Sequence, residues 1–214
     1  MTILPRGKMI KDHLDAKKLK LPEAFLKMCS THFSGYLSFE AQSSSGVMCY
    51  ADGKVIAAQW CSGELILSGR YAVDMLFRTV QQDHCTMGFF RLETSFMPIL
   101  RQICNGEVVV RGQLMDLVDI SRLLARVEDE SFNGALRLYA ESSVLIFYND
   151  GVANGFFRDG DVQMVTDVDV DTSVVKEQGC RVDIINYADG IDSGESLGIN
   201  LEKMWLQVWR ELNP

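Results

Sequence analysis

Two stretches of this 214-residue chain repeat one pattern, and the duplication constrains the fold more than any other feature of the sequence. Phe33–Trp60 reads FSGYLSFEAQSSSGVMCYADGKVIAAQW, and Phe132–Phe157, which begins 99 residues later, reads FNGALRLYAESSVLIFYNDGVANGFF. Both contain F-x-G-x-L, a Ser-rich turn, an apolar run ending in tyrosine, and Asp-Gly. The spacing between the copies changes only in the Ser-rich turn and after Asp-Gly, where a chain tolerates changes of length. The sequence therefore predicts a duplicated structural unit.

Each copy is predicted to contain an antiparallel meander of three strands. The expected strands are Tyr36–Ala41, Val47–Tyr50 and Lys54–Trp60, and then Gly134–Tyr139, Val144–Tyr148 and Val152–Phe157. Asp52-Gly53 and Asp150-Gly151 lie between apolar runs, a pattern typical of two-residue hairpin turns in which glycine takes a positive φ. These aspartates are interpreted as turn residues and not as catalysts. The expected structural turn residues are Gly35, Gly134, Gly53 and Gly151.

Helical periodicity flanks both meanders. In the first copy, a helix at Leu21–Cys29 precedes the meander, and a helix at 66–82 and a strand at Thr86–Glu93 follow it. The 66–82 helix has a clear apolar stripe, formed by Ala72, Val73, Leu76, Phe77 and Val80. The residues of Phe96–Asn105 are expected to form a short helical connector.

The second copy is predicted to begin with a helix at Leu114–Val127 and to end with a strand at Cys180–Tyr187. Between its meander and that strand, Val162–Gln178 is rich in Val and Asp and lacks a strong helical stripe. A closing helix is expected at Ile199–Leu212. Because Val162–Gln178 should cover its sheet poorly, we expect the closing helix to pack on the second copy or against a second protomer.

These elements define an α+β fold of two repeated α-β-β-β-α-β units with antiparallel meanders, followed by a C-terminal helix. The predicted parts are a basic N-terminal arm (1–20), the first repeat unit with its connector (21–111), the second repeat unit (112–198) and the closing helix (199–214). The arm is interpreted as a solvated, frayed end. Phe33 and Phe132 are expected to be buried equivalents, each anchoring its leading helix to the first strand of its meander.

The charge distribution bears on the class of partner. Residues 1–105 carry 12 Lys and Arg against 9 Asp and Glu, whereas residues 106–214 carry 9 against 20. Nucleic-acid binding requires a basic surface that displaces counterions, so the acidic second half argues against a nucleic-acid partner.

The cysteines and the hydropathy pattern bear on location. The six cysteines form no C-x-x-C pair, and several lie within apolar runs, where a free thiol behaves as a small hydrophobe. A reducing compartment is therefore favoured. No signal peptide and no membrane-spanning run is expected, since the first twenty residues lack a continuous apolar segment and no run of about 18 apolar residues occurs. The protein is predicted to be cytoplasmic.

No motif in the sequence indicates a reaction. The three histidines are not spaced with Cys or carboxylates as a zinc site requires. Asp167-x-Asp169-x-Asp171 matches the start of a calcium loop, but Thr172 stands in place of the required glycine and Gln178 in place of the last glutamate. Neither G-x-x-x-x-G-K-[ST] nor G-x-G-x-x-G occurs. We expect no catalytic residue, no metal and no cofactor, and interpret the protein as a non-enzyme.

The order of a helix, F-x-G-x-L, a Ser- or Gly-rich turn, an apolar strand, Asp-Gly and a further apolar strand resembles the bacterial PATAN domain, named for the N-terminal region of PatA-like response regulators. The resemblance is closest in Leu117–Phe157 and looser in Phe25–Leu92, together about half of the chain. It implies a signalling adaptor that binds other proteins, such as a response regulator. Unlike many family members, the chain contains no receiver domain. A G-x-x-A helix start is present only as Gly69–Ala72.

Two functions from different classes follow. The favoured hypothesis is a non-enzymatic protein–protein interaction module in bacterial signal transduction, with a signalling protein as its partner; a homodimer is also compatible. The partner-binding residues are expected at Asp167, Asp169, Asp171 and Trp209. The alternative is a small-ligand sensor with a pocket between the two meanders, lined by Trp60, Phe156 and Phe157. An enzyme of unknown class is the least favoured interpretation.

Overall fold

The computed structural model describes residues 4, 7–158, 161, 164–165, 172–187 and 196–214. Across these residues the chain forms five α-helices and two antiparallel sheets, of six and five strands. The predicted α+β class, the two antiparallel sheets and the C-terminal helix are confirmed. Asp167, Asp169 and Asp171 lie outside the described residues.

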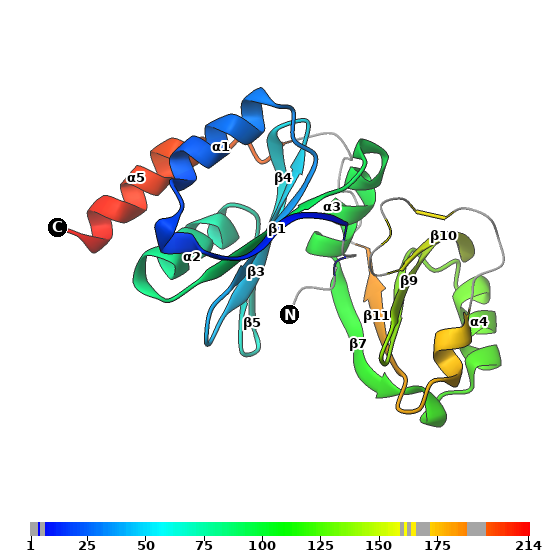
Figure 1. Ribbon diagram of the computed structural model, residues 1–214. Coiled ribbons are helices and arrows are strands. Elements are labelled where there is room, and N and C mark those ends of the chain that lie inside the picture. Colours follow the sequence, from blue (N-terminus) through cyan, green and yellow to red (C-terminus); the bar gives the residue numbers. More distant parts are fainter. Residues whose placement is uncertain (1–3, 5–6, 159–160, 162–163, 166–171, 188–195) are drawn as a thin grey trace.

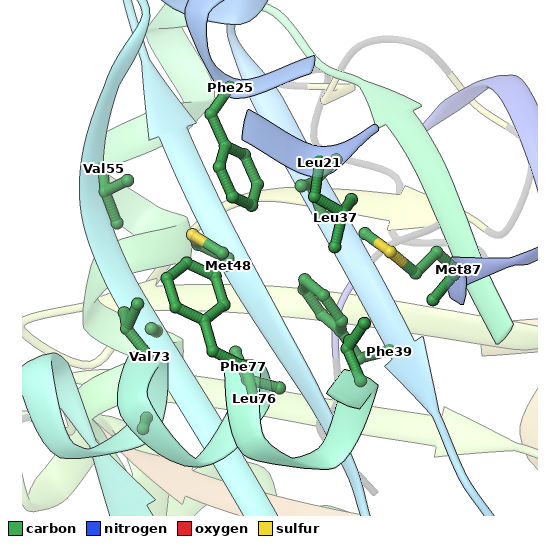
Figure 2. Close-up of a cluster of buried hydrophobic side chains, with 14 of the residues drawn as sticks. Leu21, Phe25, Leu37, Phe39, Met48, Val55, Val73, Leu76, Phe77 and Met87 are labelled. Atoms are coloured by element: carbon green, nitrogen blue, oxygen red, sulfur yellow. The ribbon is translucent and has the colours of Figure 1, made fainter. Parts of the chain in front are cut away.

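The first sheet is covered by helices on one face (Figure 1). Its strands lie in the order β1 (Lys8–Asp15), β6 (Thr86–Arg91), β2 (Gly35–Glu40), β3 (Ser45–Ala51), β4 (Lys54–Ser62) and β5 (Leu65–Ser68). Helices α1 (Leu21–Ser30) and α2 (Gly69–Gln82) supply the cover. Figure 2 shows Phe25 of α1 and Phe77 of α2 directed towards Met48 of β3, and the two phenylalanine rings stack with centroids 5.4 Å apart. The predicted stripe of α2 is buried in this core.

The second sheet has the order β10 (Val152–Arg158), β9 (Ser143–Asn149), β8 (Gly134–Tyr139), β11 (Arg181–Asn186) and β7 (Glu107–Leu114). Helix α4 (Ile120–Asp129) and two short 3₁₀ helices, η3 (Met115–Leu117) and η4 (Thr172–Lys176), accompany it. In the first repeat β5 and α2 connect the meander to the last strand; in the second repeat the described part of this connection contains only η4 as a helix.

The repeated unit is longer than predicted. The order β1-β6-β2-β3-β4 in the first sheet matches β7-β11-β8-β9-β10 in the second. Residues 8–15 therefore form an edge strand with a counterpart at 107–114, which corrects the expectation of a frayed arm. The expected helix at Leu114–Val127 begins at Ile120, because its first residues belong to β7 and η3. β5 also differs from the expectation, which places residues 66–68 in the following helix.

The ends of the meanders are built alike in both repeats. Phe33 and Phe132 each accept a hydrogen bond at the carbonyl oxygen from the N–H of the hairpin glycine, at 2.8 and 2.9 Å. Their rings lie 5.9 and 6.0 Å from the equivalent tyrosine rings. Gly53 and Gly151 have φ values of 77° and 75°, as predicted. The expected structural equivalence of Phe33 and Phe132 is thus confirmed, but Phe132 is only partly buried.

Gly35 and Gly134 also occupy equivalent positions, but they are not turn residues. They open β2 and β8, facing Tyr50 and Tyr148 in register. A Cβ at Gly35 would lie 2.1 Å from the Phe90 carbonyl oxygen, and one at Gly134 would lie 2.2 Å from that of Ile185. Glycine is needed here because another backbone approaches closely.

A carboxylate stabilises the same β-bulge in both repeats but comes from different strands. His13 of β1 and Gly112 of β7 have positive φ within equivalent interruptions of the strand register. In the first repeat Asp12 Oδ1 accepts the His13 N–H at 2.8 Å. In the second, Asp183 of the neighbouring strand accepts the Gly112 N–H at 2.7 Å. The first-repeat counterpart of Asp183 is Gly88, where an added Cβ would lie 2.8 Å from Asp12 Oδ1.

Helix α3 (Met97–Asn105) lies between the two sheets (Figure 1). It shares one apolar cluster with the inner faces of both sheets. Phe96 precedes the helix, and its ring centroid lies 5.3 Å from that of Phe147 and 5.4 Å from that of Phe157. Because the central strands are covered on both faces, their sequences are apolar almost throughout: in β9, Leu145 and Phe147 face α3 while Val144 and Ile146 face the opposite core.

Helix α5 (Leu201–Leu212) packs on the first repeat, which corrects the expectation that it would cover the second. Met204 and Val208 are buried with α1 and α2. The Trp205 ring meets Phe77 edge-on at 5.2 Å between centroids, and Glu211 pairs with Arg78 of α2. Asn200 begins the helix, accepting the Lys203 N–H at its side chain. The amphipathic pattern requires an apolar surface for α5, and the open side of α1 and α2 supplies it.

The unequal burial of two equivalent phenylalanines gives a stability prediction. Replacing the buried Phe33 by alanine should lower the free energy of unfolding by about 3–5 kcal/mol. The same change at Phe132 should have a smaller effect, because that side chain keeps part of its surface in water. Denaturant titrations of Phe33→Ala and Phe132→Ala provide the comparison. Equal losses, or a larger loss at Phe132, would contradict the burial seen here.

The burial of the cysteines predicts how many thiols react in the folded protein. None of the six forms a disulfide bond, and Cys29 alone is exposed. Burial raises the pKa of Cys85 to about 11, and a hydrogen bond with Cys104 together with burial raises the pKa of Cys49. The thiolate is the reactive form, so one thiol should react rapidly with an aromatic disulfide reagent at neutral pH and the others only after unfolding. A Cys29→Ser variant should lose the rapid phase; its persistence would show that a second thiol is accessible.

Candidate functional site

The residues predicted to bind ligand or partner do not form one site. Trp209 is exposed on α5, and Figure 1 places α5 at the opposite end of the molecule from α4. The expectation that Trp209 lies beside the second repeat is therefore wrong. Trp60, Phe156 and Phe157 belong to three separate apolar clusters, and Phe157 packs against Phe96 beside α3. These three aromatic residues do not line a shared pocket between the meanders.

A patch of apolar side chains does reach the surface on the outer side of the second repeat. Leu117 is 75% exposed, Val152 63% and Leu124 38%. Ile120 and Leu123 are half-buried beside them in sequence. We call this set, Leu117, Ile120, Leu123, Leu124 and Val152, the α4 face.

Local sequence explains how the α4 face is presented. Asp119 caps the helix by accepting the Arg122 N–H at 3.1 Å. Ile120, Leu123, Leu124 and Val127 then recur at helical spacing on one side of α4. Only Val127 is fully buried. The hairpin at Gly151 fits closely against the backbone of Val127 and Glu128, which places Val152 next to the end of the helix.

The first repeat shows what covers the equivalent surface there. Phe25 occupies the position of Leu124 and is only 4% exposed, because Phe77 of α2 stacks on it. The chain leading into α5 crosses the same surface, and the Leu197 N–H donates to the Val55 carbonyl oxygen at 2.8 Å. Phe25, Lys54 and Val55 form a cleft with residues 198–202. Lys54 and Val55 correspond to Val152 and Ala153 of the second repeat.

In the described part of the second repeat, the connection that corresponds to α2 contributes only the short η4, whose Val174 and Val175 pack in the same apolar cluster as Ile120 and Leu123. No described helix of this repeat corresponds to α5. The comparison of the repeats therefore shows that the fold requires an apolar side of this helix but does not require long helices to cover it. Both repeats keep an apolar helix face at this position, and within the described residues the first repeat alone places long helices against it.

The surroundings of the α4 face are acidic. Residues 116–130 include five Asp and Glu against two Arg, and Arg126 is paired with Glu130 at 2.7 Å. Asp150 lies in the adjoining hairpin. The exposed apolar surface is therefore bordered mainly by negative charge.

The described residues provide no metal centre: they contain no group of three or more His, Cys, Asp or Glu placed to hold a metal ion. Nor do the described helices include one long and apolar enough to cross a membrane. Comparisons with protein-family models, with curated proteins and with solved structures found no match.

Alanine substitutions at Phe25 and Leu124 test the exposure of the α4 face. Phe25→Ala should cost about 3–5 kcal/mol of unfolding free energy, because it leaves a cavity beneath α2. Leu124→Ala should cost about 1 kcal/mol or less, since much of that side chain is already in contact with water. Thermal and denaturant unfolding measure both. A loss at Leu124 as large as that at Phe25 would mean that another part of the chain buries the α4 face.

Proposed function

We propose that this protein is a non-enzymatic protein–protein interaction module of bacterial signal transduction, and that its α4 face binds an amphipathic helix of a partner protein. The observation that carries the proposal is the exposure of Leu124, whose first-repeat counterpart Phe25 is buried beneath α2, together with the apolar Leu117 and Val152 exposed near the two ends of α4.

The first repeat supplies the form of the interaction. There an extended segment pairs with β4 through Leu197, and an amphipathic helix follows and packs on α1 and α2. A partner segment with the same order, a short extended stretch followed by a helix, would match the second repeat. Apolar residues at i, i+3, i+4 and i+7 would occupy the α4 face, as in other helix-in-groove complexes.

Charge indicates the kind of helix. Negative groups border the α4 face, so Lys and Arg flanking the apolar stripe of the partner would complement it and suppress acidic competitors. The border charges would affect mainly the association rate and its salt dependence, and the apolar contacts would supply most of the affinity.

The signalling context rests on the resemblance of Leu117–Phe157 to PATAN domains. That stretch contains all five residues of the α4 face: Leu117 in η3, three in α4, and Val152 in the meander. A response regulator or another signalling protein is accordingly the proposed partner class.

Photo-crosslinking from defined positions tests this function. A photoreactive amino acid at Leu117 or Leu124 should capture one protein in cells of the native host, through a segment that is helical and basic. The matched control is Leu26 on α1, which is 57% exposed but lies on a helix already covered by α5. The identified partner should bind the purified protein, and Leu117→Lys should weaken binding at least about tenfold while leaving unfolding unchanged.

Three results would contradict the proposal. The first is equal capture from Leu26 and from the α4 face. The second is capture of a second copy of this chain alone, which would identify a homodimer contact. The third is unchanged partner affinity in Leu117→Lys. Measuring the affinity with phosphorylated and unphosphorylated response regulators would test the proposed partner class separately.

A further inference from the structure

A polar cavity of about 500 Å³ lies in the first repeat, away from the α4 face. It forms where β1, the end of α1, the start of β2 and the short helix η2 (Thr94–Phe96) after β6 come together. Two cationic side chains line it, Lys8 and Arg91, together with the imidazole of His32 and the hydroxyl groups of Thr31, Ser34, Thr94 and Ser95.

Lys8 and Arg91 are exposed, and neither makes an ion pair with another residue that the structure describes. Other cations of the protein do have partners, such as Arg78 with Asp74 and Arg126 with Glu130. Within the described residues these two cations make no ion pair, and they outnumber the single carboxylate of the lining, Glu93, so the cavity provides a local site for an anion in a protein with net charge −8.

The hydroxyl lining is preorganised. Ser34 Oγ accepts the Asp52 N–H at 3.0 Å and the Thr94 hydroxyl at 3.3 Å. With both contacts made to the oxygen, the hydroxyl hydrogen of Ser34 can donate to a bound group. The two contacts also join the β3–β4 hairpin to η2 across the cavity.

His32 is held by a carboxylate. Its Nδ1 lies 2.6 Å from Asp52 Oδ1, so Nδ1 carries the hydrogen and Nε2 is the ring nitrogen left for another partner. The backbone at His32 has φ 49°, and the equivalent Ser131 has the same value. The fold therefore requires this backbone conformation but does not require histidine.

The second repeat shows that the two cationic side chains of the cavity are not structural necessities either. The counterparts of Lys8, His32 and Arg91 are Glu107, Ser131 and Asn186. The same backbone framework thus forms with neutral or acidic side chains at these positions. The cationic character of the cavity belongs to the first repeat alone.

We propose that this cavity binds a small polar molecule through its phosphate group, with Arg91 and Lys8 binding the phosphate, the hydroxyl side chains completing its contacts, and His32 Nε2 accepting a hydrogen bond from a hydroxyl group of the ligand. An Arg fork with hydroxyl donors suits phosphate oxygens. Leu92 is the one apolar residue of the lining, and the hydroxyl side chains around it suit a ligand whose remainder is hydroxylated, as in a sugar phosphate. Glu93 also lines the cavity and disfavours a ligand with several clustered negative charges.

Nuclear magnetic resonance titration of the full chain with glucose 6-phosphate tests the proposal. Backbone amides at 31–34 and 91–95 should shift in a saturable manner. Glucose alone, and sodium chloride at matched ionic strength, should leave them unchanged, and inorganic phosphate should shift the same amides with lower affinity. Shifts that follow ionic strength alone, or that map to another surface, would overturn the assignment.

Substitutions taken from the second repeat provide variants compatible with the fold. Lys8→Glu combined with Arg91→Asn should weaken glucose 6-phosphate binding roughly ten- to a hundredfold, since two charged contacts are lost. Lys11→Glu, the same charge change at an exposed position of β1 outside the cavity, should bind normally.

His32→Ser is a second, milder variant, which should weaken binding less than the double exchange and which keeps the test decisive if the double variant unfolds. Unchanged affinity in both variants would overturn the proposal. Binding of a phosphoserine peptide, with no binding of glucose 6-phosphate or inorganic phosphate, would replace the small molecule by a protein ligand and overturn the assignment in that way.

Discussion

The structure depends on the burial of α3 between the inner faces of two sheets. Leu100 and Cys104 of this helix are fully buried, and Phe96 ahead of it contacts Phe147 and Phe157 of the second sheet. On the other side, the Gln59 side chain donates to the Cys104 carbonyl oxygen at 3.1 Å. Exposing the inner face of either sheet to water would be unfavourable, because its strands carry large apolar side chains there. One connector of nine residues thus joins two copies of a unit into one core.

Much of the fold was accessible from sequence because the meanders carry strong local information. Asp-Gly at 52–53 and 150–151 specifies hairpins, and the apolar runs on either side specify strands. The sequences of the outer strands contain weaker local signals. β1 contains four charged residues and a histidine and is exposed over more than half of its length, as suits a protected sheet edge. Its pairing with β6 joins residues far apart in the chain. A constant spacing of 99 residues between Ala16 and Met115, Leu19 and Val118, and Leu21 and Ile120 was the available indication that the repeat began earlier.

The candidate site was predictable in part. The apolar stripe of the helix before the second meander could be recognised from its spacing, but its exposure could not. Exposure depends on where α5 packs, and an amphipathic helix records only that it needs an apolar surface. Phe77 and Arg78 of α2 determine the choice by contacting Trp205 and Glu211. The cationic cavity was missed for a related reason: Lys8, His32 and Arg91 are far apart in sequence, and the pairing of β1 with β6 brings them together. Comparing the two copies position by position, Lys8 with Glu107 and Arg91 with Asn186, could have indicated it.

The carboxylate that stabilises the β-bulge has a consequence for how the two halves could have diverged. Asp12 serves its own strand, whereas Asp183 reaches across from the neighbouring one, and Gly88 leaves the room that Asp12 needs. Gaining an aspartate at the Gly88 position first would bring two carboxylates into contact, and losing Asp12 first would leave the N–H of the bulge without its acceptor. Starting from the first-repeat arrangement, the single exchange at Gly88 is the unfavourable one, so the residues at these two positions depend on each other. Strands β1 and β6 therefore form one unit in this respect, and so do β7 and β11. A chimaera that exchanged one strand without its neighbour would place two carboxylates, or none, at the β-bulge.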